Sequence, residues 1–131
     1  MMVTDPIGDF LTRLRNAVQR KHDDVTLPST KMIVSIAEIL KREGYINDFV
    51  VNEKKPQNEI TVYLKYVNGE SAITELERVS KPGIRRYRGY REIGRVKSGL
   101  GISIFSTPKG LKTGDEARKE KLGGEYICNI A

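Results

Sequence analysis

Apolar residues in the first third of the chain recur with the period of amphipathic helices. Five of them, spaced three or four positions apart, predict a helix with Asp5 as its N-cap and Pro6 at its first position. They are Ile7, Phe10, Leu11, Leu14 and Val18. A second apolar stripe predicts a helix that begins at Ser29 or Thr30 and ends before Gly44. Its members are Ile33, Ile36, Ala37 and Leu40.

Strand patterns surround the second helix. Residues 25–27 predict a short strand, and residues 45–52 and 59–66 predict two strands joined by a polar turn that contains Pro56. Asn68-Gly69 predicts a further tight turn. The first part of the chain therefore predicts the order helix, strand, helix, strand, strand.

Beyond residue 70 the glycines multiply and the predicted elements shorten. The expected strands there are residues 73–79, 85–90, 102–107 and 125–130. Thr113 and Glu116 have the spacing of a capping box and predict a short helix that ends near Lys121.

These elements predict two domains with a boundary between residues 68 and 75. We expect an α+β fold of two small α/β domains. Residues 1–70 form the N-terminal domain, and residues 71–131 form a mostly antiparallel, β-rich domain with a short helix.

Composition places the chain among folded proteins and locates its charge. The 131 residues are 38% hydrophobic and 31% charged, with 23 basic and 17 acidic side chains. Residues 1–70 hold ten of each sign, whereas residues 71–131 hold thirteen basic and seven acidic side chains. The whole net charge of +6 therefore belongs to the second part.

Residues 78–97 contain eight basic side chains and one acidic side chain, so they predict an anionic partner. Nucleic acid is the first candidate, and an acidic membrane surface is the second. Membrane binding requires an amphipathic helix, which Pro82, Gly83, Gly89 and Gly94 disfavour in this segment. The tyrosines of the segment, Tyr87 and Tyr90, suit stacking on unpaired bases.

The stretch from Gly99 to Gly110 predicts a half-buried strand that ends in a stiff loop. Ser106 and Thr107 bring hydroxyl groups, Pro108 restricts the backbone and Lys109 brings a charge. A plain surface turn is the alternative interpretation. The chain has no evident recognition helix for the DNA major groove, and such a loop suits the shallow minor groove of RNA, so RNA is favoured over DNA.

Enzymatic interpretations rest on short motifs. Ser106 and Lys109 fit S-x-x-K, and residues 112–114 fit K-T-G, as in serine β-lactamases, but no S-D-N motif is present. His22 is the single histidine and Cys128 the single cysteine, so we expect no catalytic site, no metal site, no cofactor and no internal disulfide. The sequence shows no signal peptide and no membrane span, so we expect a cytoplasmic protein.

Longer motifs resemble a known family. The most specific are Gly99-Leu100-Gly101-Ile102-Ser103-Ile104, Ser106-Thr107-Pro108-Lys109-Gly110, Glu116-Ala117-Arg118 and Gly123-Gly124-Glu125. Together with Thr4-Asp5-Pro6-Ile7 and Ser80-Lys81-Pro82-Gly83, they are similar to the bacterial ribosomal protein S8 family of the small subunit. The resemblance covers nearly the whole chain. One departure is Pro108, where many members carry a hydroxyl residue.

The resemblance implies a structural protein of the ribosome with two α/β domains. Members bind the central domain of 16S rRNA early in small-subunit assembly, lie beside other small-subunit proteins, and in some bacteria repress their own operon through its mRNA. It also implies a monomer when free and no contact with membranes.

The same resemblance assigns roles to residues. The loop from Ser106 to Gly110 reads an irregular RNA helix, Glu125 braces that loop, and Tyr87 supplies an aromatic contact. The full RNA-binding set that we expect is Thr4, Asp5, Lys31, Lys55, Arg86, Tyr87, Arg88, Ser106, Thr107, Pro108, Lys109, Gly110, Gly124 and Glu125.

Overall fold

The computed structural model describes residues 5–131, without the side chains of residues 97 and 98. It contains two compact units, Pro6–Ile73 and Thr74–Ala131, and Asp5 groups with the second unit. The expected α+β class, with a β-rich C-terminal part, is confirmed.

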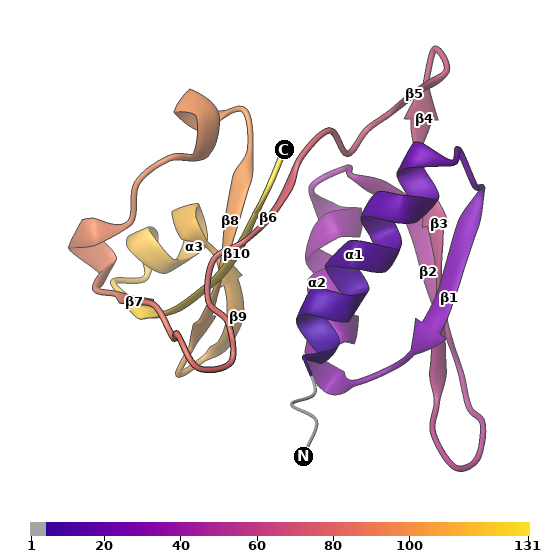
Figure 1. The fold of residues 1–131 in the computed structure, drawn as a ribbon. Helices are drawn as coiled ribbons and strands as arrows, with labels where there is room; N and C mark the ends of the chain where they lie inside the picture. The colour runs from indigo at the N-terminus through magenta and orange to yellow at the C-terminus, as the bar shows by residue number, and fades with distance from the viewer. Residues whose placement is uncertain (1–4) are drawn as a thin grey trace. The chain divides into compact units, whose positions relative to one another are not determined.

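The unit Pro6–Ile73 is a three-stranded antiparallel sheet with two helices on one face (Figure 1). Its main elements are α1 (Pro6–Gln19), β1 (Asp24–Pro28), α2 (Lys31–Arg42), β2 (Ile46–Asn52) and β3 (Glu59–Leu64), with β3 in the centre. A small hairpin follows, β4 (Tyr66–Val67) with β5 (Glu70–Ser71).

The predicted apolar stripes form the core of this unit. Phe10 and Leu14 of α1, and Ile36 and Leu40 of α2, are fully buried. Along β3, Ile60, Val62 and Leu64 are buried while the residues between them are not, as alternation requires. Thr30 caps α2, since its side chain accepts a hydrogen bond from the Ile33 amide at 3.2 Å.

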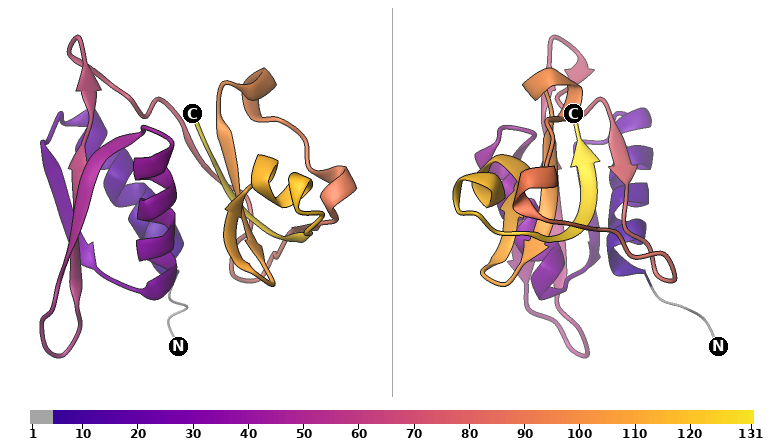
Figure 2. Two further views of the ribbon diagram at one scale, coloured as in Figure 1. Left: turned by 180° about the vertical axis from the view of Figure 1, so that it is seen from behind. Right: turned by 90° about the vertical axis from the view of Figure 1, so that its left-hand side faces the viewer.

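The unit Thr74–Ala131 is built around one long strand, which is the last of its sheet in chain order. That strand is β10 (Gly124–Ile130), and it pairs antiparallel with β6 (Leu76–Arg78), β7 (Tyr87–Arg88) and β8 (Ile102–Thr107). A hairpin joins β8 to β9 (Gly110–Thr113). The remaining elements are η1 (Tyr90–Glu92), η2 (Val96–Gly99) and α3 (Gly114–Lys119) (Figure 2).

The core of the second unit lies between α3 and the sheet. The Phe105 and Tyr126 rings stack with centroids 4.6 Å apart, and they pack with Ile93 and Ala117. Burial raises the pKa of the Tyr126 hydroxyl. The capping box of Thr113 and Glu116 is present in full, with both hydrogen bonds formed.

The second unit also differs from the sequence prediction. The basic segment at residues 85–90 is a strand only at Tyr87–Arg88, because β10 pairs with it only at Gly124 and Glu125. Strand β9 was not predicted, since its pairing with β8 joins residues on both sides of a turn. The strand predicted at residues 73–79 is shorter and spans Leu76–Arg78.

Candidate nucleic-acid interface

Pairing across four strands brings distant parts of the sequence into one row. Glu125 of β10 pairs with Tyr87 on one side and with Ser106 on the other. Gly124 pairs with Arg88, and Thr107 pairs with Gly110. Eight predicted RNA-binding residues therefore lie together at one end of the sheet, here called the four-strand row. They are Arg86, Tyr87, Arg88, Ser106, Thr107, Gly110, Gly124 and Glu125.

The two faces of this row differ in what covers them. Side chains alternate along a strand, so Tyr87, Glu125 and Ser106 point to one face. Phe105 and Tyr126, which pack with α3, point to the other. Tyr87 is 63% exposed, so its side chain is available to a ligand.

The Thr107 side chain stabilises the loop through hydrogen bonds to its backbone. Its buried hydroxyl donates to the Gly110 carbonyl at 2.7 Å and accepts from the Lys109 amide at 3.2 Å. Both bonds close the turn between β8 and β9. The hydroxyl therefore serves the shape of the loop, and its donor hydrogen is already used.

The rest of the loop is exposed and faces outward. Pro108 lies at the first central position of the two-residue turn, where its fixed φ suits the backbone and no amide hydrogen is needed. Gly110 follows with φ of 101°, a value that favours glycine. The side chain of Lys109 has no ion-pair partner among the described residues.

Gly124 allows β10 to approach the base of this loop. A Cβ atom at Gly124 would lie 2.1 Å from the Ser106 carbonyl oxygen and 3.2 Å from the Thr107 Cα. No side chain fits at such distances, so the approach of the two strands requires glycine at this position.

Glu125 is held by two donors from the segment that precedes β7. The Ser80 hydroxyl donates to Glu125 Oε2, and Arg85 Nη1 lies 3.1 Å from the same oxygen. The brace that we expected from Glu125 therefore runs to Ser80 and Arg85 rather than to the loop side chains. Sequence reasoning missed both partners, although Ser80 belongs to the quoted motif at residues 80–83.

The arginines of the basic segment divide into paired and unpaired side chains. Arg78 Nη2 binds Asp5 Oδ1 at 3.0 Å, and the Arg78 side chain is only 11% exposed. Arg88 donates to the Tyr87 carbonyl at 3.0 Å. Arg86 is exposed and has no side-chain partner among the described residues, so its charge is available to phosphate.

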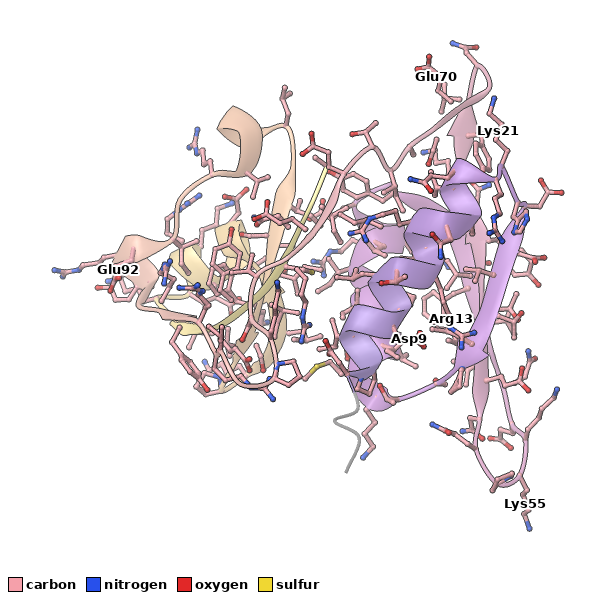
Figure 3. All side chains as sticks on the ribbon, viewed as in Figure 1. Asp9, Arg13, Lys21, Lys55, Glu70 and Glu92 are labelled. Carbon is pink, nitrogen blue, oxygen red and sulfur yellow. The ribbon has the colours of Figure 1, made fainter. Side chains whose placement is uncertain are left out.

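Two further predicted residues, Lys31 and Lys55, belong to the unit Pro6–Ile73. Lys55 lies at the tip of the loop between β2 and β3 (Figure 3). Lys31 is the first residue of α2, and the Ser29 amide donates to the Asn58 carbonyl at 2.8 Å, which ties that loop to the start of α2. Both lysines are exposed. Thr4, by contrast, lies outside the described residues, and Asp5 is engaged by Arg78.

Ser106 and Lys109, which match the S-x-x-K motif, lie near the end of β8 and in the tight turn between β8 and β9. Within residues 5–131 no hydrogen bond links the Ser106 hydroxyl to a base. The described residues include no cluster of three potential metal ligands. None of the helices they form has the length and apolar character that crossing a membrane requires.

Comparison with known proteins identifies the family. The model of the family described as Ribosomal protein S8 matches residues 5–131. The chain belongs to the ribosomal protein S8 family. This confirms the resemblance drawn from the loop and glycine motifs.

Relatives of similar length support the same assignment. The small ribosomal subunit protein uS8 of Halothermothrix orenii is 51% identical over 131 residues, with 99% of each chain covered. That of Anaeromyxobacter sp. strain Fw109-5 is 52% identical with the same coverage, and that of Paraburkholderia phymatum is 50% identical over the full length of both chains. Membership of this family makes the chain a ribosomal protein of the small subunit.

Proposed function

We propose that this protein binds the central domain of 16S rRNA during assembly of the small subunit and has no catalytic activity. The observation that carries the proposal is the four-strand row with the loop that adjoins it. Together they present an exposed tyrosine, a rigid turn and two cations, Arg86 and Lys109, that have no ion-pair partner among the described residues. Neighbouring small-subunit proteins are its other partners. It acts in the cytoplasm, where the subunit is assembled.

The chemistry of the row and of its adjoining loop suits structured RNA. Arg86 and Lys109 contribute charge toward phosphates, and this contribution falls with salt. The Tyr87 ring offers a stacking surface for a base that is not paired. The backbone of the loop, held by Thr107, fits the wide minor groove of an A-form helix, where 2′-hydroxyl groups are accessible.

A messenger RNA with the same local structure would use the same surface. Repression of the protein's own operon is therefore a second role of the site rather than a second site. Sedimentation of the cellular protein separates the two, since a ribosomal role places most of it with small subunits. A pool found mainly with mRNA would assign regulation as the main role.

The direct test compares a transcript of the 16S central domain with a transcript of another 16S domain. We expect tighter binding to the central domain at every salt concentration. Equal affinity for both transcripts would contradict the proposal.

Substitution of Arg86 tests the charge contribution. We expect Arg86→Ala to weaken binding to both transcripts by similar factors and to lower the slope of log affinity against log salt by about 1, because one phosphate contact is lost. Lys119→Ala is the control, since this exposed cation of α3 lies outside the four-strand row. A loss confined to the central-domain transcript would contradict a phosphate contact for Arg86.

A further inference from the structure

Ser80 is a fully buried polar residue that joins two parts of the RNA-facing sheet. Its hydroxyl donates to Glu125 Oε2 and accepts from the Arg86 amide at 3.2 Å. Its own amide donates to the Tyr126 carbonyl at 3.0 Å. Donor and acceptor capacity of the hydroxyl are both used, so the residue is not simply filling space.

The segment that Ser80 anchors is joined to β10 by backbone bonds at its two ends and by the ion pair of Arg85 with Glu125. β6 and β7 pair with different parts of β10, and residues 79–86 form the connection between them. Within this connection, Lys81 and Ile84 exchange two backbone hydrogen bonds of 3.0 Å around the Pro82–Gly83 turn. The turn stabilises itself, but these bonds do not attach it to the sheet.

Attachment to β10 comes at the two ends of this turn. At its start, Ser80 binds Glu125 through its hydroxyl. At its end, the Arg86 carbonyl accepts from the Tyr126 amide at 2.8 Å and the Arg86 amide donates to Ser80. Backbone pairing with β10 places Arg86 and Tyr87, and the Ser80 hydroxyl makes this position more rigid by joining the Arg86 amide to the Glu125 carboxylate.

Glu125 is a carboxylate that lies among basic side chains, and its contacts give a reason for its presence. Its Oε2 atom accepts from Ser80 and from Arg85, and the Glu125 side chain is only 18% exposed. An isolated carboxylate beside an RNA backbone would repel phosphate. Paired with Arg85, it instead fixes the basic segment to the strand that also contacts the loop at Ser106.

We propose that Ser80 is a positioning residue for RNA binding, which holds Arg86 and Tyr87 in fixed register with the loop from Ser106 to Gly110. The inference rests on the proposed function. Without the hydroxyl, the backbone pairing of β7 and β8 with β10 remains, but the link from the Arg86 amide to the Glu125 carboxylate is lost and the basic segment is held less rigidly. Selective binding then decreases, whereas the general attraction to phosphate persists because no charge is lost.

The test measures Ser80→Ala against the central-domain transcript and against an unrelated RNA duplex. We expect affinity for the central domain to fall about tenfold, as loss of a charge-assisted hydrogen bond implies. Affinity for the unrelated duplex and the salt slope stay at the wild-type values. Hydrogen exchange of the Arg86 amide accelerates, because its acceptor is removed.

Ser103→Ala is the matched control. Ser103 is a buried serine of β8 in the same sheet, and no hydrogen bond joins its side chain to the four-strand row among the described residues. We expect this variant to bind both RNAs like the wild type. Should Ser80→Ala fail to fold, Ser80→Cys takes its place, since the thiol keeps the volume but is a weak donor.

The possible outcomes distinguish a failure of the proposed RNA binding from a failure of the role of Ser80. Wild-type protein without preference for the central domain overturns the proposed function and, with it, the role of Ser80. Selective wild-type protein whose folded Ser80 variant keeps full affinity overturns the positioning role alone. Equal losses for both RNAs, or an equal loss in Ser103→Ala, also overturn it, because they indicate a general effect on the sheet.

Discussion

At the scale of single residues, the loop depends on hydrogen bonds that point inward. Thr107 looks from the sequence like a side chain that reads RNA, yet its hydroxyl binds the Gly110 carbonyl and the Lys109 amide. The groups left for a ligand at the loop are the Lys109 amine, the Ser106 hydroxyl and backbone atoms. We therefore expect the loop to recognise RNA chiefly by its shape.

Thr107→Ala tests this arrangement. We expect the loss of both hydroxyl bonds to weaken binding to the central-domain transcript by about 1–2 kcal/mol, because the turn no longer holds one conformation. Thr107→Ser keeps the hydroxyl and should retain most of the affinity. Equal losses in the two variants would assign the effect to the methyl group rather than to the hydroxyl.

Cys128 provides a prediction on pH. Complete burial raises the pKa of its thiol from the ordinary 9.0 to about 12. Above pH 9 the unfolded chain loses a proton that the folded chain retains, so the contribution of this thiol to stability is constant below this pH and falls above it. We expect the free energy of unfolding, measured with urea, to fall with pH by about 1.4 kcal/mol per unit more steeply than in Cys128→Ala. Parallel profiles of the two proteins would contradict this.

At the scale of elements, the close approach of β10 to β8 positions the four-strand row. Gly124 permits it, because any Cβ atom there would meet the Ser106 carbonyl. The approach also affects how far Glu125 lies from Ser106 and Tyr87, its partners on the two neighbouring strands. We therefore expect the spacing of these strands to matter for the proposed RNA binding.

Gly124→Ala should separate these strands. We expect a loss of about 1–3 kcal/mol in unfolding free energy, typical of overpacking, together with weaker RNA binding. Gly94→Ala is the control, since a Cβ at Gly94 meets nothing within 4 Å and should change stability by less than about 0.5 kcal/mol. Similar stability of both variants would show that the strands have room to move.

Sequence patterns predicted the elements whose causes are local. The apolar stripes of α1 and α2 and the alternation in β3 were sufficient, because each element buries a face of its own. β9 and the short β7 were not predicted correctly, because their extent depends on partners elsewhere in the chain. For the same reason the pairing of Ser80 with Glu125, which are 45 positions apart, has no signal in one sequence.

At the scale of the whole molecule, charge and structure divide the chain in a similar way. The unit Pro6–Ile73 has nearly balanced charge, and some of its cations form ion pairs, such as that of Arg13 with Asp9 (Figure 3). The unit Thr74–Ala131 carries the basic excess and the four-strand row. We expect the second unit to provide selectivity and the first to add a backbone contact.

Lys55→Ala tests that added contact. We expect it to lower the salt slope of RNA binding by about 1, since Lys55 is exposed and has no ion-pair partner among the described residues. Its neighbour Lys54 is the control, because its amine already binds Glu59 at 2.9 Å and Lys54→Ala should change the slope less. Equal slopes for Lys55→Ala and the wild type would remove Lys55 from the RNA contact.

The position of β10 in chain order has a consequence for synthesis. β6, β7 and β8 all pair with β10, which follows each of them in the sequence. A growing polypeptide therefore exposes its basic segment before the strand that organises it has been made. We expect the cations to attract RNA without selecting among sequences until β10 has paired with these strands. A chain that is cut short before β10 should therefore bind RNA without preference for the central domain.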